Sequence, residues 1–399
     1  MVDVELSEAR PPRLTLTALF LRFLRFGVFA FGGPVAQIAI IRRELVDHER
    51  WIDSSRFNRL LAVMQVLPGP EAHELCVHMG IRARGRLGGL LAGLGFMLPG
   101  LVLMLLAAWA YSELAGQSAV LAAVFVGVQA AVLAIIARAV HRIGEHILTS
   151  ASLWVIMGAT TVATVAGVSF WIVLPAAGLS YAGLRSGRWW LVALALSAAI
   201  AMALATQFNT REFAPPPTAA MAATTFALFV AGLKGGLLTF GGAYTAIPFV
   251  RMDTVGRGWA TDAQFLDGVG LANVLPAPLV IFATFVGWMS GGLVGALAIT
   301  AGMFLPAFAF SMIFYERLER LVEDDRLQTF LTGVAAAVVG VIAVTAFQLA
   351  AAAVANTPNI LVTAALFVAA LLVVYFWNSR YSPPAVLVTG AIIGAVLLR

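Results

Sequence analysis

The sequence predicts an all-α integral membrane protein, an inverted-topology repeat of two helical halves with Gly/Pro-broken helices and a connecting helix between them. Three observations carry this prediction: an apolar composition, a series of helix-length apolar segments, and an internal repeat of glycine and proline motifs. Of the 399 residues, 61% are hydrophobic and 11% are charged, whereas soluble domains carry about 25% charged residues. So little charge cannot cover a globule in water, and we expect the lipid bilayer to contact much of the chain.

Composition also argues against several other classes of protein. A single cysteine, Cys76, excludes a disulfide framework and a thiolate metal cluster. The five histidines form no HxxxH or HExxH pattern, so we expect no metal, no cofactor and no catalytic group. The net charge of +5 fits arginines in cytoplasmic loops better than nucleic-acid binding. The polar residues 1–13 lack the features of a signal peptide.

The apolar segments are of two kinds. Nine are long enough, at about 20 residues, to cross a bilayer as helices: 87–112, 118–137, 150–167, 168–184, 188–206, 292–314, 329–353, 359–377 and 383–398. Four others, 14–41, 56–82, 219–250 and 263–289, have a Gly/Pro break near the middle. The arms beside residues 68–70 have only about 13 residues, or about 20 Å of helix. We therefore interpret the broken segments as re-entrant hairpins, with complete crossings as the alternative.

The breaks belong to an internal repeat whose offset shrinks from 209 to 206 residues. FGGP at 31–34 matches FGGA at 240–243, QVLPGP at 65–70 matches NVLPAP at 273–278, and LPG at 98–100 matches LPA at 305–307. Trp51 and Gly127 match Trp259 and Gly333 in the same order. Chance similarity between apolar helices does not produce five ordered matches of this kind, so the chain contains two copies of one unit.

The second copy is expected to be inverted. The predicted domains are a first membrane repeat at 14–184, a connecting helix and linker at 188–217, and a second membrane repeat at 218–399. An unpaired span between two copies reverses the orientation of the second copy in the membrane. Arg138 and Arg142 mark a cytoplasmic loop, and the basic residues Arg317 and Arg320 lie in a loop whose first-half counterpart has none. We predict a protein of the cytoplasmic membrane with its N-terminus cytoplasmic and its C-terminus external.

The four breaks are the expected substrate site. Non-helical backbone at membrane depth persists only where it is buried or lines a cavity, and a helix that restarts there presents free N–H donors and partial positive charge. Pro34 and Pro70 suit the first turn of such a helix. We therefore predict an anion site, with kinks for packing as the alternative. The breaks contribute Gly32, Gly33, Pro34, Pro68, Gly69, Pro70, Gly241, Gly242, Pro276 and Pro278.

Two cations and two amides hold matching positions beside the breaks. Arg25 and Lys234 each precede a glycine break by six residues, about 9 Å along a helix. Ionisable groups inside membrane segments are functional candidates; the alternative is snorkelling to the interface, which fits Arg22 better. Gln65 and Asn273 precede the proline breaks, where an amide can donate to an oxyanion or satisfy a carbonyl that the prolines leave free.

The helix after residue 70 departs from the symmetry of the repeat. It carries the polar residues Glu71, Glu74 and His78, whereas the matching positions of the second half hold apolar residues. They are candidates for proton coupling because histidine titrates near neutral pH. The alternatives are a carboxylate that complements the helix dipole and a shallow helix that faces water. Three aspartates are expected to cap helices: Asp53, Asp262 and Asp267.

These motifs together resemble the chromate ion transporter family, in its two-domain bacterial type. The resemblance covers nearly the whole chain and is carried by the motifs at 31–34, 67–70 and 238–243. It implies efflux of chromate from the cytoplasm, resistance to chromate, and handling of the isosteric sulfate; it does not extend to the two histidines of the polar helix. The expected partner is chromate or a sulfate-like oxyanion. Transport of another anion, a membrane enzyme acting on a lipid phosphate, a structural subunit and a homodimeric assembly stay open.

Overall fold

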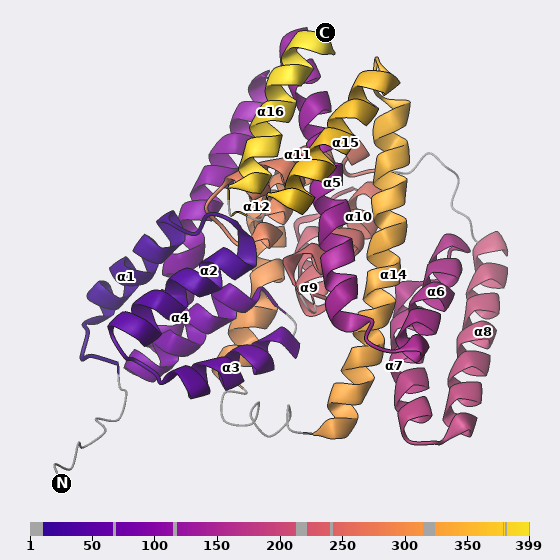
Figure 1. Ribbon diagram of the computed structural model, residues 1–399, viewed down its shortest axis with the longest axis horizontal. Helices are drawn as coiled ribbons and strands as arrows, with labels where there is room; N and C mark the ends of the chain where they lie inside the picture. Colours follow the sequence, from indigo (N-terminus) through magenta and orange to yellow (C-terminus); the bar gives the residue numbers. More distant parts are fainter. Residues whose placement is uncertain are drawn as a thin grey trace.

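The computed structural model describes residues 11–66, 69–114, 118–212, 222–239, 242–313, 324–377, 379 and 381–398. Within these ranges every regular element is helical (Figure 1), which confirms the predicted all-α fold. The first half contains α1 (Leu16–Val28), α2 (Gly33–Arg42), η1 (Arg43–His48), α3 (Ser54–Val66), α4 (Glu71–Leu114), α5 (Ala119–Ile147), α6 (Ala151–Val165) and α7 (Phe170–Arg185). After α8 (Trp189–Glu212), the second half contains α9 (Thr225–Leu237), η2 (Ala243–Thr245), α10 (Ala246–Thr254), η3 (Val255–Arg257), α11 (Asp262–Val274), η4 (Leu279–Ile281), α12 (Phe282–Ile313), α14 (Asp325–Ala355), α15 (Ile360–Phe376) and α16 (Ser382–Leu397).

Four helical segments are long and apolar enough to cross a membrane: Glu71–Leu114, Ala119–Ile147, Leu279–Ile313 and Asp325–Ala355. Several of the other predicted spans are shorter than expected, since α6, α15 and α16 have 15, 17 and 16 residues. Large apolar side chains lie exposed on α6, α14 and α15, where lipid can cover them: Trp154, Phe347 and Phe376. The protein is therefore a multi-pass membrane protein.

The repeat is visible in the backbone at a position where the motifs did not reveal it. Inside α4, the φ/ψ angles are −146°/30° at Arg84 and 66°/−162° at Gly85. Inside α12, they are −156°/25° at Gly291 and 61°/−155° at Gly292. The two kinks lie 207 residues apart, within the offset of the sequence repeat. Each kink folds a short N-terminal arm back along the long helix that follows it: a Cβ on Gly80 would lie 2.4 Å from the carbonyl oxygen of Gly88.

The first of the broken segments forms a hairpin in the structure. Gly27, next to the first break, packs against Phe96 near the middle of the long part of α4, since a Cβ there would lie 2.4 Å from the Phe96 carbonyl oxygen. The chain then turns back, because Glu49, which follows η1, forms an ion pair with Arg22 of α1. The first break therefore lies about halfway along the long helix, and the loop after η1 returns to the middle of α1.

The two halves interlock. Helix α5 packs against α15 and α16 of the other half, and α14 packs against α6 and α7 in return (Figure 1). Both contacts are glycine-lined: a Cβ on Gly127 would lie 2.1 Å from the carbonyl oxygen of Gly390, and one on Gly333 would lie 3.0 Å from Cα of Gly178. Small residues let membrane helices approach closely. Neither half buries its helices alone, and the two form one folded unit.

The predicted helix caps are right for one aspartate and wrong for two. Asp53 Oδ1 accepts a hydrogen bond of 2.9 Å from the backbone N–H at position 56, and so caps α3. Helix α11 is capped instead by Thr261. Asp262 is the first residue of α11, where it pairs with Arg251 at 2.7 Å, and Asp267 is buried in the middle of the helix. A serine or threonine just before an aspartate is the better cap here because its hydroxyl reaches the third following amide.

Candidate functional site

The four breaks converge on one point at the centre of the molecule. A small void of about 10 Å³ lies there, and each break contributes a residue to its wall. Its lining residues are Pro34, Gln37, Pro70, Glu71, Ala72, Ala243, Pro278 and Leu279. Helices α2, α4, α10 and α12 begin at this void, the last two through the leading turns η2 and η4. Four helix N-termini therefore bring free N–H donors and partial positive charge together, around a space no larger than one water molecule.

The breaks are joined crosswise between the halves. Gln37 Nε2 donates to the carbonyl oxygens of Ala30 (2.9 Å) and Ala277 (2.8 Å), so the first break is tied to the fourth. The second break is tied to the third, because the Gly69 N–H donates to the Thr239 carbonyl oxygen at 2.9 Å. Under the repeat, Ala30 matches Thr239 and Ala277 matches Gly69. Gly69 and Thr239 are thus bonded directly. The matching pair, Ala277 and Ala30, is bonded through the side-chain amide of Gln37.

The alternation of glycine and alanine in the motifs has a packing reason. A Cβ on Gly100 would lie 2.2 Å from Cβ of Ala277, and a Cβ on Gly69 would lie 3.1 Å from Cβ of Ala307. These are matching contacts, since Gly100 and Ala307 correspond, as do Gly69 and Ala277. Each contact has room for one methyl group. The glycine of the LPGP break at 67–70 therefore packs against the alanine of the LPA motif at 305–307. The alanine of the LPAP break at 275–278 packs against the glycine of the LPG motif at 98–100.

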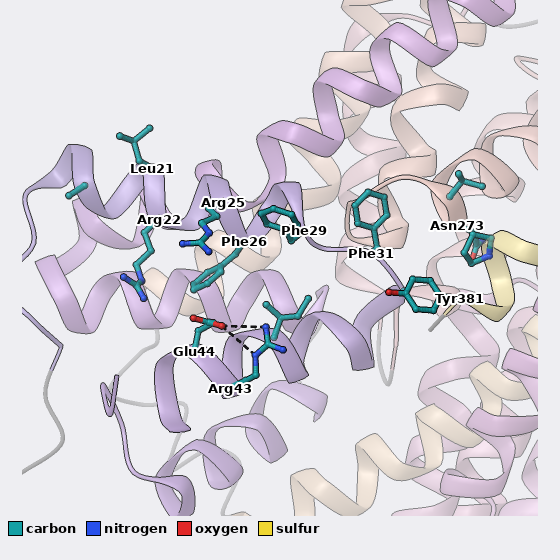
Figure 2. Close-up of a pocket in the computed structure, with 15 residues that line it drawn as sticks. Leu21, Arg22, Arg25, Phe26, Phe29, Phe31, Arg43, Glu44, Asn273 and Tyr381 are labelled. Atoms are coloured by element: carbon teal, nitrogen blue, oxygen red, sulfur yellow. Dashed lines mark hydrogen bonds and ion pairs between the residues drawn. The ribbon is translucent and has the colours of Figure 1, made fainter. Parts of the chain in front are cut away.

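A larger cavity of about 880 Å³ lies beside the first break (Figure 2). It is bounded by α1, α2 and η1 of the first half and by the end of α11 and the start of α16 of the second. Its lining residues are Ala18, Leu21, Arg22, Arg25, Phe26, Phe29, Phe31, Gly32, Ile40, Arg43, Glu44, Asn273, Val274, Tyr381 and Pro384. Three arginines and one glutamate give the lining a positive balance, which attracts anions.

The three arginines are held differently. Arg22 pairs with Glu49 and lies over two aromatic rings, and Arg43 pairs with Glu44 at 3.3 Å. Within the part of the chain that the structure describes, the Arg25 guanidinium forms neither an ion pair nor a hydrogen bond. Figure 2 shows it on the α1 side of the cavity, across from Glu44. Of the cationic groups in this cavity, the Arg25 guanidinium is therefore the one with its donors free.

Other predicted site residues line the large cavity or the central void. Gly32, with a φ of 92°, lines the cavity and caps α2, which begins at Gly33. Pro34 and Pro70 face the central void. Two of the predicted contributors, Pro68 and Gly241, lie outside the described residues, as does the side chain of Gln65. Gly242 is described and has a φ of 128°.

Asn273 lies at the rim of the cavity and is partly satisfied within the protein. Its Oδ1 accepts a hydrogen bond of 2.8 Å from the Tyr244 hydroxyl, and its Nδ2 donates to the Val269 carbonyl oxygen at 2.9 Å. An amide nitrogen has two donors, so one N–H is left for a ligand. The two prolines that follow, Pro276 and Pro278, are buried on either side of the residue that Gln37 contacts.

Lys234 lines neither the large cavity nor the central void. Its Nζ pairs with Asp253 at 3.1 Å, and the same carboxylate accepts a 2.9 Å bond from Arg257. Phe249, which matches the cavity residue Ile40, is completely buried. The two halves therefore differ at this pair of matching positions: Ile40 lines the cavity, whereas Phe249 is buried in the core.

The polar start of α4 lies against the void. Glu71 lines it, and Glu74, one turn later, is completely buried with neither carboxylate oxygen hydrogen-bonded among the described residues. Glu74 and His78, although four residues apart, are therefore not bonded to each other. The neighbouring His73 packs edge-on against Phe304, with ring centroids 5.0 Å apart.

Sequence reasoning missed four residues that the structure brings to these sites. Gln37 and Thr239 join the breaks, and Glu44 and Asp253 accept ion pairs beside them. Signals for them exist in the sequence. Gln37 is polar within the apolar run 35–41, and Glu44 and Asp253 match under the 209-residue offset.

Comparison with known proteins decides the family. The chromate transporter family matches residues 17–232 and again residues 226–395, so that each half matches once. The chain belongs to this family. The chromate transport protein of Pseudomonas aeruginosa is 55% identical over 97% of this chain and 94% of its own length. That of Cupriavidus metallidurans is 31% identical over 96% of this chain and 94% of its own, and the probable chromate transport protein of Synechococcus elongatus is 30% identical over 96% of each.

No solved structure matches this member of the chromate transporter family. Its relatives are named as transport proteins, which favours a transporter over the membrane enzyme considered above. The two matched stretches also agree with the two helical halves that the structure shows.

Proposed function

We propose that this protein exports chromate across the cytoplasmic membrane and thereby confers resistance to it. One observation carries the proposal: a cavity with an unpaired arginine lies next to the point where four helix N-termini converge. Such N-termini bind anions with backbone donors, and several donors suit an oxyanion with several oxygens. The names of the relatives supply chromate as the substrate.

The route follows from the two spaces. Chromate enters the 880 Å³ cavity from the cytoplasm and is drawn toward Arg25, which faces Glu44 across it. Gly32, a residue of the first break, lines this cavity, so the cavity reaches the break. The central void of about 10 Å³ is too small for an oxyanion, so the breaks must move apart to admit it. The N-terminus is cytoplasmic and the C-terminus external in this proposal.

The membrane potential alone can drive this export. One charge that crosses the membrane changes the free energy by about 2.3 kcal/mol per 100 mV. A dianion that leaves a negative-inside cell therefore gains about 4.6 kcal/mol per 100 mV. Since about 1.4 kcal/mol corresponds to a factor of ten, 100 mV sustains a gradient on the order of 10³-fold.

The test is chromate flux into inside-out vesicles, with the potential set by potassium and valinomycin at equal pH on both sides. We expect an interior-positive potential to accelerate chromate uptake and an interior-negative potential to slow it. Flux that ignores voltage and follows only a pH gradient would refute voltage-driven export. Parallel measurements with sulfate decide the substrate: sulfate flux above that of chromate would assign the protein to the alternative anion.

A further inference from the structure

A buried carboxyl group lies behind the central void, and the proposed route gives it no role. The Glu74 side chain is 0% exposed, and neither of its oxygens has a hydrogen-bond partner in the described part of the chain. An ionised carboxylate without a partner and away from water is so unfavourable that such groups neutralise instead. The geometry therefore requires a proton on Glu74 in this conformation.

Among the described residues, no charged side chain bonds to the Glu74 carboxyl oxygens. Glu71, one turn earlier on the same helix, adds a like charge. The second break covers the carboxyl group through Gly69, since a Cβ there would lie 2.7 Å from Glu74 Oε1. The facing helix α12 contributes Ala307 beside Gly69 and contains no Asp, Glu, Lys, Arg or His. The basic side chains of α1, α3 and α9 do not bond to the Glu74 oxygens: Arg22, Arg25, Arg56, Arg59 and Lys234.

The cover over Glu74 is also a wall of the anion site. The Gly69 N–H bonds to the Thr239 carbonyl oxygen at 2.9 Å and joins the second break to the third. An oxyanion cannot enter the void of about 10 Å³ unless these breaks separate. Their separation also removes Gly69 from Glu74 and lets water reach the carboxyl group. The motion that opens the anion site therefore hydrates Glu74, and the motion that closes the site dehydrates it.

We propose that Glu74 is a proton-binding site that permits the anion site to close: the break seals over this side chain only after the carboxylate has taken a proton from water. The proposal rests on the proposed function, since closure is a step of transport. A bound oxyanion strengthens the requirement, because a nearby negative charge disfavours a second one. The proton is bound at low pH and lost as pH rises, so closure and transport slow as pH rises.

Glu74→Gln tests this step, since glutamine has nearly the shape of a neutral carboxyl group but does not titrate. In proteoliposomes, the wild-type rate should fall by up to about tenfold per pH unit once the carboxyl group ionises. E74Q should keep one rate across the same range. The matched control is Glu113→Gln, at the exposed end of the same helix, which should keep the wild-type profile. An E74Q protein that is inactive at every pH, or that keeps the wild-type profile, overturns the proposal.

Two features of the experiment separate this proposal from the proposed function. Sulfate and chromate are both used as probes. Each variant is compared with wild type at the same pH, so that any effect of protonation of the anion itself cancels. Independently of transport, infrared difference spectra of wild type and E74Q at neutral pH should show the carbonyl band of a protonated carboxylic acid in the wild type alone. Absence of that band refutes the proton on Glu74. A wild-type protein that carries neither anion refutes the proposed function while the infrared result still stands.

Discussion

At the scale of single residues, two cations that match in sequence have different surroundings. Arg25 lines an open cavity without an ion pair among the described residues, whereas Lys234 is bound by Asp253 at 3.1 Å. A free guanidinium can bind an oxyanion with several donors at once. A lysine already paired with a carboxylate contributes little to the attraction of an anion. The two residues therefore play different parts, although the repeat relates them.

We expect Arg25→Ala to raise the KM for chromate by roughly 10- to 100-fold, because a hydrogen bond to a charged group is worth about 1.5–3 kcal/mol. Lys234→Ala should lower the maximal rate and leave KM nearly unchanged. Flux in proteoliposomes at varied chromate concentration separates the two effects, with the exposed Arg188→Ala as a control that changes neither. Full transport by the double variant R25A/K234A would reassign both residues to anchoring at the membrane interface.

At the scale of elements, the hairpins are held by contacts between a break of one half and the long helix of the other. Gly100 of α4 touches Ala277, and Gly69 touches Ala307 of α12. The two contacts match, yet they differ in one respect. Gly69 has a φ of 148°, where side chains are strained, whereas Gly100 lies within a regular helix.

The difference predicts which substitutions can be rescued. Gly100→Ala should destabilise the protein by about 1–3 kcal/mol, because its Cβ would lie 2.2 Å from that of Ala277. Adding Ala277→Gly should restore most of the loss, since it removes the methyl group in the way. Gly69→Ala should not be rescued by Ala307→Gly, because the backbone strain and the Glu74 contact persist. Thermal unfolding in detergent measures all four proteins, and equal rescue at both contacts would contradict the strain argument.

The elements show what the sequence could predict and what it could not. The Gly/Pro breaks and the repeat were predictable because they depend on local backbone chemistry and segment length. The bond of Gln37 to Ala277, 240 residues away, was not, because it depends on how the halves pack. Asp267 shows the same limit: its position suggested a helix cap, but α11 begins earlier, at Asp262, and the Asp267 carboxylate accepts hydrogen bonds from Tyr111 (2.8 Å) and Gln129 (2.9 Å) instead.

At the scale of the whole molecule, the two halves match in sequence but differ in conformation. The first half has an open cavity with Arg25 and Glu44 in its lining. In the second half the matching residues, Lys234 and Asp253, are paired, and Phe249, which matches the cavity residue Ile40, is buried. Halves related by inversion can exchange their conformations, and the exchange moves the opening to the other side of the membrane. In the exchanged state, we expect Arg25 to pair with Glu44 and the second pair to separate.

Matching substitutions should therefore have opposite effects. Asp253→Asn removes an ion pair from the present state, so it should favour the exchanged state and close the cavity. Glu44→Gln removes the pair that the exchanged state would form. It also removes the Arg43–Glu44 pair of the present state, but Arg43 is exposed and such surface pairs contribute little, so the substitution should keep the cavity open. A few kcal/mol separates such states, and loss of a partly buried pair should shift their ratio several-fold. The readout is labelling of Phe29→Cys, an exposed position in the cavity, by a membrane-impermeant thiol reagent in a Cys76→Ser background. E44Q should raise the labelling rate and D253N should lower it, whereas a purely structural role for the carboxylates would move both rates in the same direction.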